Sequence, residues 1–101
     1  MPYSLSDLMP LIVNEDGDAF HLHDQEAPVL ETHRKLHYVE NPAFEAGETR
    51  TMLRSIAPPD DFNDAIRYGL ALFIHKYADS EFQVLAFKEC DSLRLEFRRV
   101  I

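Results

Sequence analysis

The hydrophobic period changes from helical to alternating at Leu70, and this change limits the fold of the last third of the chain. Apolar residues then recur at every second position in three stretches, which are broken at residues 78–80 and 90–92. Their alternating apolar residues are Leu70, Leu72, Ile74, Phe82, Val84, Ala86, Leu93, Leu95 and Phe97. Because successive side chains of a strand point to opposite faces, this period indicates strands. The pattern predicts a three-stranded antiparallel meander with one buried face and one wet face.

Two helical patterns come immediately before the meander. Residues 45–56 place Thr49 and Leu53 on one apolar stripe, with acidic residues near the positive end of the helix dipole. Residues 58–69 begin with two prolines, which suit a first helical turn, and end at Gly69, which suits a C-cap. The sequence therefore predicts two consecutive helices that pack on the meander.

The N-terminal part predicts one helix and three more strands. A helix after Ser4 or Ser6 follows from apolar residues spaced by three and four, although Pro10 weakens it unless it lies in the first turn. Strands are expected at residues 19–23, 29–32 and 36–39. This order contains no alternating βαβ run, so the fold class is α+β, with an antiparallel sheet of about six strands covered on one face by about three helices. A chain of 101 residues fits a single domain, 1–101.

Charge and hydropathy exclude several partners. A net charge of −8 repels nucleic-acid phosphates and anionic membrane surfaces. The longest apolar stretches, residues 11–13 and 70–74, are far shorter than a membrane-spanning helix. No basic N-terminal flank of a signal peptide is present, and Cys90 is the single cysteine, so we expect a cytoplasmic protein.

No catalytic motif is recognisable. A phosphate-binding P-loop needs closely spaced glycines followed by Lys and Ser or Thr, but the only glycines are Gly17, Gly47 and Gly69. No nucleophile motif surrounds the serines or Cys90. We therefore expect no catalytic residues and no cofactor.

The histidines give a weak metal signal. His21 and His23 share one strand face, and His37 is near in sequence, so the three imidazoles are conceivable zinc or nickel ligands. Neither the H-E-x-x-H motif nor a Cys/His pair pattern accompanies them. Polar-face histidines without a metal are the favoured interpretation, and metal-dependent catalysis is the weaker alternative.

One basic cluster is a candidate for interaction. Arg94 and Arg98 share a strand face, where they could meet a carboxylate-bearing partner or an acidic patch of this chain. His21 is the third candidate interaction residue. The sequence leaves open which of these readings holds and which sheet face binds.

Taken in order, these elements resemble the N-terminal domain of type IV pilus retraction (twitching motility) ATPases and type II secretion ATPases. The residues that carry the resemblance include the first strand at 18–22, the hairpin at 27–30 and its return strand at 36–40. The second helix at 49–56, the fifth strand at 82–87 and the end at 95–101 also match. The resemblance covers nearly the whole chain.

The resemblance implies a PAS-like fold that, in the family, precedes a RecA-like motor and packs on the motor of a neighbouring subunit in a hexamer. Three positions depart from the family pattern: Ala19 replaces an acid, Gln83 replaces an arginine, and a glycine is missing near Asp91. The chain is either a piece of a longer ATPase or a free-standing, diverged copy, and the departures favour the second.

These observations predict a non-catalytic interaction or regulatory domain associated with a pilus or secretion motor. Its expected partner is a protein, either the ATPase, its platform or a further copy of this chain. The alternative is a PAS-like module that senses a small molecule enclosed between the helices and the sheet.

Overall fold

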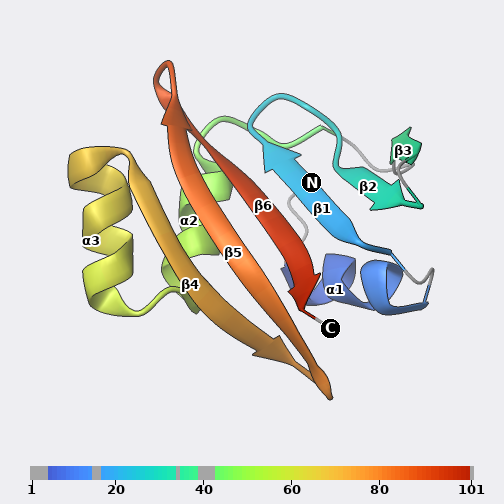
Figure 1. Cartoon of the computed structure of the whole chain (residues 1–101). Coiled ribbons are helices and arrows are strands. Elements are labelled where there is room, and N and C mark those ends of the chain that lie inside the picture. Colours follow the sequence, from blue (N-terminus) through green and yellow to red (C-terminus); the bar gives the residue numbers. More distant parts are fainter. Residues whose placement is uncertain (1–4, 15–16, 34, 39–42, 101) are drawn as a thin grey trace.

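A computed structural model describes residues 5–14, 17–33, 35–38 and 43–100, and Figure 1 shows how its helices and strands are arranged. The elements are α1 (Leu5–Asn14), β1 (Ala19–His23), β2 (Val29–Thr32), β3 (Lys35–Tyr38), α2 (Glu48–Ile56), α3 (Pro59–Tyr68), β4 (Leu70–Tyr77), β5 (Ser80–Glu89) and β6 (Ser92–Val100). The predicted order of helix, three strands, two helices and three strands is confirmed. None of these helices is long and apolar enough to cross a membrane.

The strands form one six-stranded sheet in the order β3-β2-β1-β6-β5-β4. Every neighbouring pair is antiparallel, so the predicted α+β class is confirmed. The first and last strands of the chain meet at the centre of the sheet, where Phe20 pairs with Phe97 and Leu22 with Leu95. The N-terminal hairpins and the C-terminal meander are thereby joined into one unit.

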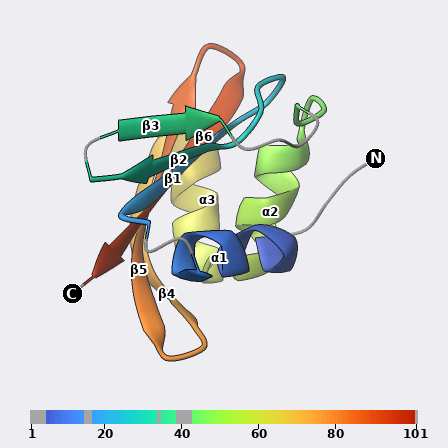
Figure 2. The ribbon, with the colours of Figure 1, turned by 90° about the vertical axis from the view of Figure 1, so that its right-hand side faces the viewer.

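All three helices lie on the same side of the sheet, as Figure 2 shows. The sheet face beneath them, here called the inner face, contributes Phe20, Phe82 and Phe97, each at most 1% exposed. Helix α1 contributes Leu8 and Ile12 to the same core, and both are fully buried. Burial of this apolar surface is the main source of the fold's stability.

Helix α2 begins at Glu48, three residues later than the sequence pattern predicts. Gly47 has a left-handed backbone with φ of 87°, which a glycine adopts without strain and which interrupts the helix there. The Asp24 carboxylate, at the end of β1, accepts the backbone N–H groups of Gly47 at 2.8 Å and Thr49 at 3.0 Å. Asp24 therefore serves as the helix cap from a distant part of the chain.

The hydroxyl of Thr49 completes this connection between α2 and the sheet. It donates to the Asp24 carboxylate at 3.0 Å or to the backbone carbonyl of Leu93 at 2.9 Å, and Thr49 is fully buried. Buried polar groups need such partners because an unpaired one costs free energy. The contacts fix the start of α2 against β1 and β6.

Helix α3 ends as the sequence predicts, and α1 accommodates Pro10. Gly69 caps α3 in a left-handed conformation, and its N–H donates to the Ala65 carbonyl at 3.0 Å. Pro10 lies inside α1 rather than in its first turn. The packing of Leu8 and Ile12 offsets the backbone hydrogen bond that a proline cannot donate. Of the two predicted caps, Ser6 is wrong because it lies inside α1, and Ser4 lies outside the described residues.

Candidate interaction surface

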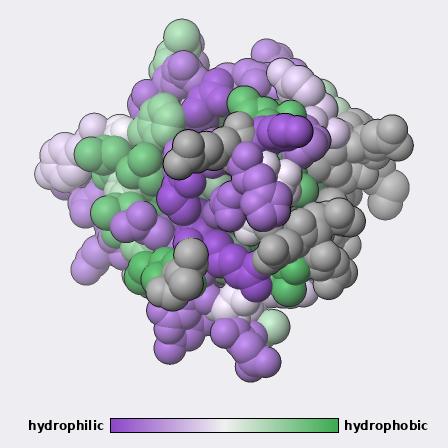
Figure 3. Space-filling model, turned by 45° about the vertical axis from the view of Figure 1, so that its right-hand side comes forward, coloured by the Kyte–Doolittle hydropathy of each residue, from purple (hydrophilic) through white to green (hydrophobic). Residues whose placement is uncertain are grey.

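The outer face of the sheet lies opposite the three helices and carries charged side chains at its centre and apolar side chains toward β4. Leu36 and Tyr38 on β3, at the other edge of this face, are also exposed. Cross-strand rows run from the apolar side chains to the charged ones: Leu72 pairs with Leu85, Leu85 with Glu96, and Glu96 with His21. The apolar members lie on β4 and β5, whereas the charged members lie on β6, β1 and β2. Figure 3 shows apolar surface gathered toward the β4 side and hydrophilic surface near the middle of the view.

The first group of charges surrounds His23. Its Nδ1 lies 2.7 Å from the carboxylate of Glu26, and its Nε2 lies 3.2 Å from the hydroxyl of Ser92. Arg94 joins the group, because its Nε donates to Glu89 at 2.7 Å and its second guanidinium nitrogen lies 3.5 Å from Glu26. Charge-assisted hydrogen bonds thus hold β1, the loop at Glu26, the end of β5 and the start of β6 together.

The second group surrounds Glu31 on β2. His21 lies 3.2 Å from one Glu31 oxygen, and a guanidinium nitrogen of Arg98 lies 3.5 Å from the other. Arg98 also contacts Glu96 at 2.9 Å. This second group links β1, β2 and β6. The two groups together form the charged part of the outer face, here called the charged band: His21, His23, Glu31, Arg94, Glu96 and Arg98.

These contacts shift the pKa values of the charged groups. The hydrogen bond with His21, aided by Arg98, lowers the pKa of Glu31 below 4.5. The hydrogen bond from Arg94 likewise lowers the pKa of Glu89. Glu96, and then Glu31, raise the pKa of Arg98. The carboxylates of Glu31 and Glu89 therefore stay ionised at neutral pH, where each faces an arginine.

The apolar part of the outer face is formed mainly by alternate residues of β4. Leu70, Leu72 and Ile74 are 58%, 54% and 51% exposed, whereas Ala71 and Phe73 between them are buried. Leu85 and Phe87 on β5 lie beside them and are half-buried. Here these five outer residues, Leu70, Leu72, Ile74, Leu85 and Phe87, are called the apolar strip.

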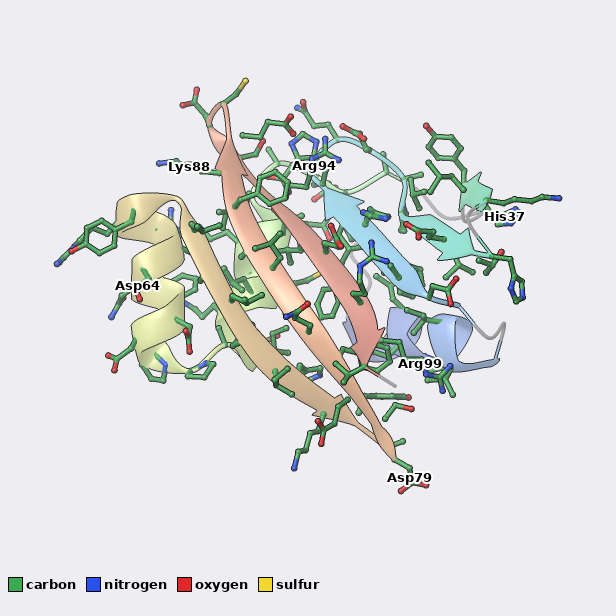
Figure 4. The ribbon with its side chains drawn as sticks, in the orientation of Figure 1. His37, Asp64, Asp79, Lys88, Arg94 and Arg99 are labelled. Carbon is green, nitrogen blue, oxygen red and sulfur yellow. The ribbon has the colours of Figure 1, made fainter. Side chains whose placement is uncertain are left out.

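The three candidate interaction residues from the sequence all lie on this outer face, but they fall into separate groups. Arg94 belongs to the group around His23, whereas Arg98 and His21 belong to the group around Glu31. Both arginines thus pair with carboxylates of this chain. Figure 4 shows Arg94 near the end of β6 that adjoins the β5–β6 turn.

Sequence reasoning did not identify the apolar strip. Both alternating sets of β4 are largely apolar, so the period alone does not say which set is buried. The sequence signal for the strip is that residues 70–75 include no Asp, Glu, Lys or Arg on either face of the strand, whereas one face of β6 is charged. A strand that is apolar on both faces needs cover on both.

The three histidines considered as metal ligands are divided between the two faces. His37 pairs with Leu30 and so lies on the face opposite His21 and His23. Among the residues that the structure describes, no group of three or more His, Cys, Asp or Glu side chains is placed to hold a metal ion.

Comparison with solved structures gives close matches in fold. No protein-family model matches the sequence, and no curated protein matches it. The crystal structure of the pilus retraction motor PilT with bound ADP superposes with a TM-score of 0.88 at 12% identity, over 99% of this chain and 30% of that one. The ATPase DotB of Legionella pneumophila gives 0.82 at 11% identity, over 99% and 31%.

DotB of Yersinia pseudotuberculosis gives a TM-score of 0.75 at 8% identity, over 94% of this chain and 29% of that one. This chain thus spans about 30% of the PilT chain, the share expected for one domain of a longer motor protein. The resemblance read from the sequence is confirmed at the level of structure: the chain has the fold of a part of the pilus retraction and secretion ATPases.

Proposed function

We propose that this chain is a non-catalytic interaction domain that docks on the motor of a pilus retraction or secretion ATPase. The observation that carries the proposal is the apolar strip on the outer sheet face. Three aliphatic side chains that are each more than half exposed, in line on one strand, form a surface suited to a partner protein.

The neighbouring charges suit the rim of such an interface. Protein interfaces combine an apolar centre with a polar rim, and ion pairs at the rim contribute more to specificity than to affinity. Arg94 and Arg98 are already held by Glu26, Glu31, Glu89 and Glu96. Because these side chains are ordered before binding, docking would cost less side-chain entropy.

The choice of partner follows from the structural neighbours. There the same fold occupies about 30% of the chain of a pilus retraction motor and of an ATPase. In this sequence Gly17, Gly47 and Gly69 are the only glycines, so no P-loop is present. A domain without nucleotide chemistry of its own would act on such a motor by docking and thereby regulate or help to assemble it.

The test is direct binding between the purified chain and the recombinant motor of a pilus retraction or secretion ATPase from the same organism. We expect saturable binding by isothermal titration calorimetry, and we expect the double variant Leu72→Asp, Ile74→Asp to abolish it. The matched control is Tyr68→Asp on α3, where a large side chain that is not part of the strip is 72% exposed.

Two results would reject the proposal. One is the absence of binding to every motor of this class that the organism encodes. The other is equal loss of binding in the strip variant and in the Tyr68 control, since that would show a general effect of added charge.

A further inference from the structure

A cleft of about 380 Å³ opens at the end of the sheet, on the helix side. It lies between the first turn of α2, the second half of α3 and the turn that joins β5 to β6. Residues of its lining that matter here are Arg50, Ala65, Ile66, Lys88, Asp91 and Leu93. The cleft is separate from the apolar strip, which faces the other side of the sheet.

Two cations of the cleft have no ion-pair partner within the part of the chain that the structure describes. They are Arg50 on α2 and Lys88 on β5, and both are exposed. Arg94 and Arg98 are paired with glutamates, and Arg54 lies 5.1 Å from the ring of Phe62. Figure 4 shows Lys88 projecting over the C-terminal end of α3.

Among the described residues, the acidic side chains of the cleft form no ion pair with these cations. Asp24 accepts hydrogen bonds from Gly47 and Thr49, so its carboxylate is committed to capping α2. Asp91 lines the cleft but lies in no salt bridge with Arg50 or Lys88 among the described residues. Two cationic groups thus remain available to an anionic ligand.

Charge and shape together define the ligand class. Ala65 and Leu93 are buried apolar residues of the lining, so the cleft offers apolar contact next to the two cations. Its volume lies within the range of small-molecule sites, about 300–1,000 Å³. Asp24 and Asp91 offset part of the positive charge of the cleft, so a singly charged anion suits it better than a doubly charged one.

We propose that this cleft binds a small monocarboxylate with an apolar body. The carboxylate meets Arg50 and Lys88, and the apolar part contacts Ala65, Ile66 and Leu93. This site is independent of docking through the outer face, so either proposal can fail alone.

The test uses the full chain and follows backbone amide signals by NMR during titration with benzoate and isovalerate. The neutral amides benzamide and isovaleramide serve as matched probes. We expect the carboxylates to shift the signals of Gly47, Arg50 and Leu93 in a saturable way, and the amides to leave them unchanged. Shifts of equal size from acids and amides would overturn the proposal.

Variants identify the residues that bind the carboxylate. Arg50→Gln and Lys88→Gln should each weaken benzoate binding by about fivefold or more, as expected for loss of one charge contact. Arg67→Gln on α3 is the control, since Arg67 is exposed and lies outside this cleft. Unchanged affinity in both cleft variants would overturn the assignment.

A peptide probe distinguishes a free small carboxylate from the carboxylate side chain of a partner protein. An acetylated, amidated Gly-Glu-Phe peptide carries its carboxylate on a peptide chain. Binding of this peptide tenfold more tightly than benzoate would reject the small-molecule assignment, whereas weaker binding would support it.

Discussion

The two faces of the sheet are formed by alternate residues of the same strands, yet they are stabilised differently. The inner face of β6 holds Leu95 and Phe97, which are fully buried beneath helices. The outer face of the same strand holds Arg94 and Arg98, which remain 28% and 44% exposed in ion pairs. Packing on the inner face determines stability, because exposed ion pairs contribute little. The outer face can therefore serve binding at small cost to folding.

Truncation of an inner-face aromatic residue should have the largest effect. Phe82→Ala and Phe73→Ala each remove a buried ring, so each should lower the free energy of unfolding by about 3–5 kcal/mol. Denaturant melts followed by circular dichroism measure this loss. If either substitution lowered the free energy of unfolding by less than an outer-face variant does, the inner face would not be the main source of stability.

The next effect concerns the hydrogen bonds that attach α2 to the sheet. Thr49→Val keeps the shape but leaves the Leu93 carbonyl and Asp24 without the hydroxyl, so unfolding should become easier by about 1–3 kcal/mol. The exposed neighbour Thr51→Val is the control in the same melts. Equal stability of the two variants would show that the buried hydroxyl is not needed.

His75 gives the inner face a dependence on pH. Its ring lies edge-on to Phe97, with centroids 6.5 Å apart, and burial lowers the pKa of His75 below 6.5. The unfolded chain then binds more protons than the folded one between the lowered pKa and 6.5, so stability should fall as pH drops through this window. His75→Phe should reduce this loss of stability at low pH, whereas His37→Gln should not. Denaturant melts at several pH values at and below 6.5 measure the difference.

The ion pairs of the outer face should contribute less. Glu31→Gln removes the partner of His21 and Arg98, and the loss should be under about 1 kcal/mol and smaller still at high salt. Because the pKa of Glu31 is lowered, its contribution is present above pH 4.5 and lost as pH falls through the lowered value. A loss comparable to that of Phe82→Ala would contradict the comparison.

The smallest effect on stability belongs to the apolar strip. Leu72→Ser should change the free energy of unfolding by no more than about 0.5 kcal/mol, since Leu72 is already 54% exposed. Thermal melts measure it, and the buried neighbour Phe73→Ala supplies the contrast on the same strand. A large loss at Leu72 would mean that the strip is part of the core.

The sequence predicts the fold well wherever one physical signal dominates. Alternation of Leu95 and Phe97 with charged residues predicts β6, and Gly69 predicts the end of α3. The start of α2 was missed because its cap is Asp24, which is distant in sequence. The apolar strip was missed because β4 is apolar on both faces. The roles of Arg94, Arg98 and His21 in binding and the PAS-like classification stay predictions.

The measurement that tests the central claim most directly is an NMR footprint of the labelled chain during titration with the motor of a pilus retraction or secretion ATPase. The account predicts that amide signals of residues 70–74 and 85–87 broaden first, while those of α2 and α3 stay unchanged. A footprint on α2 and α3, with the outer sheet face unaffected, would contradict docking through the outer face.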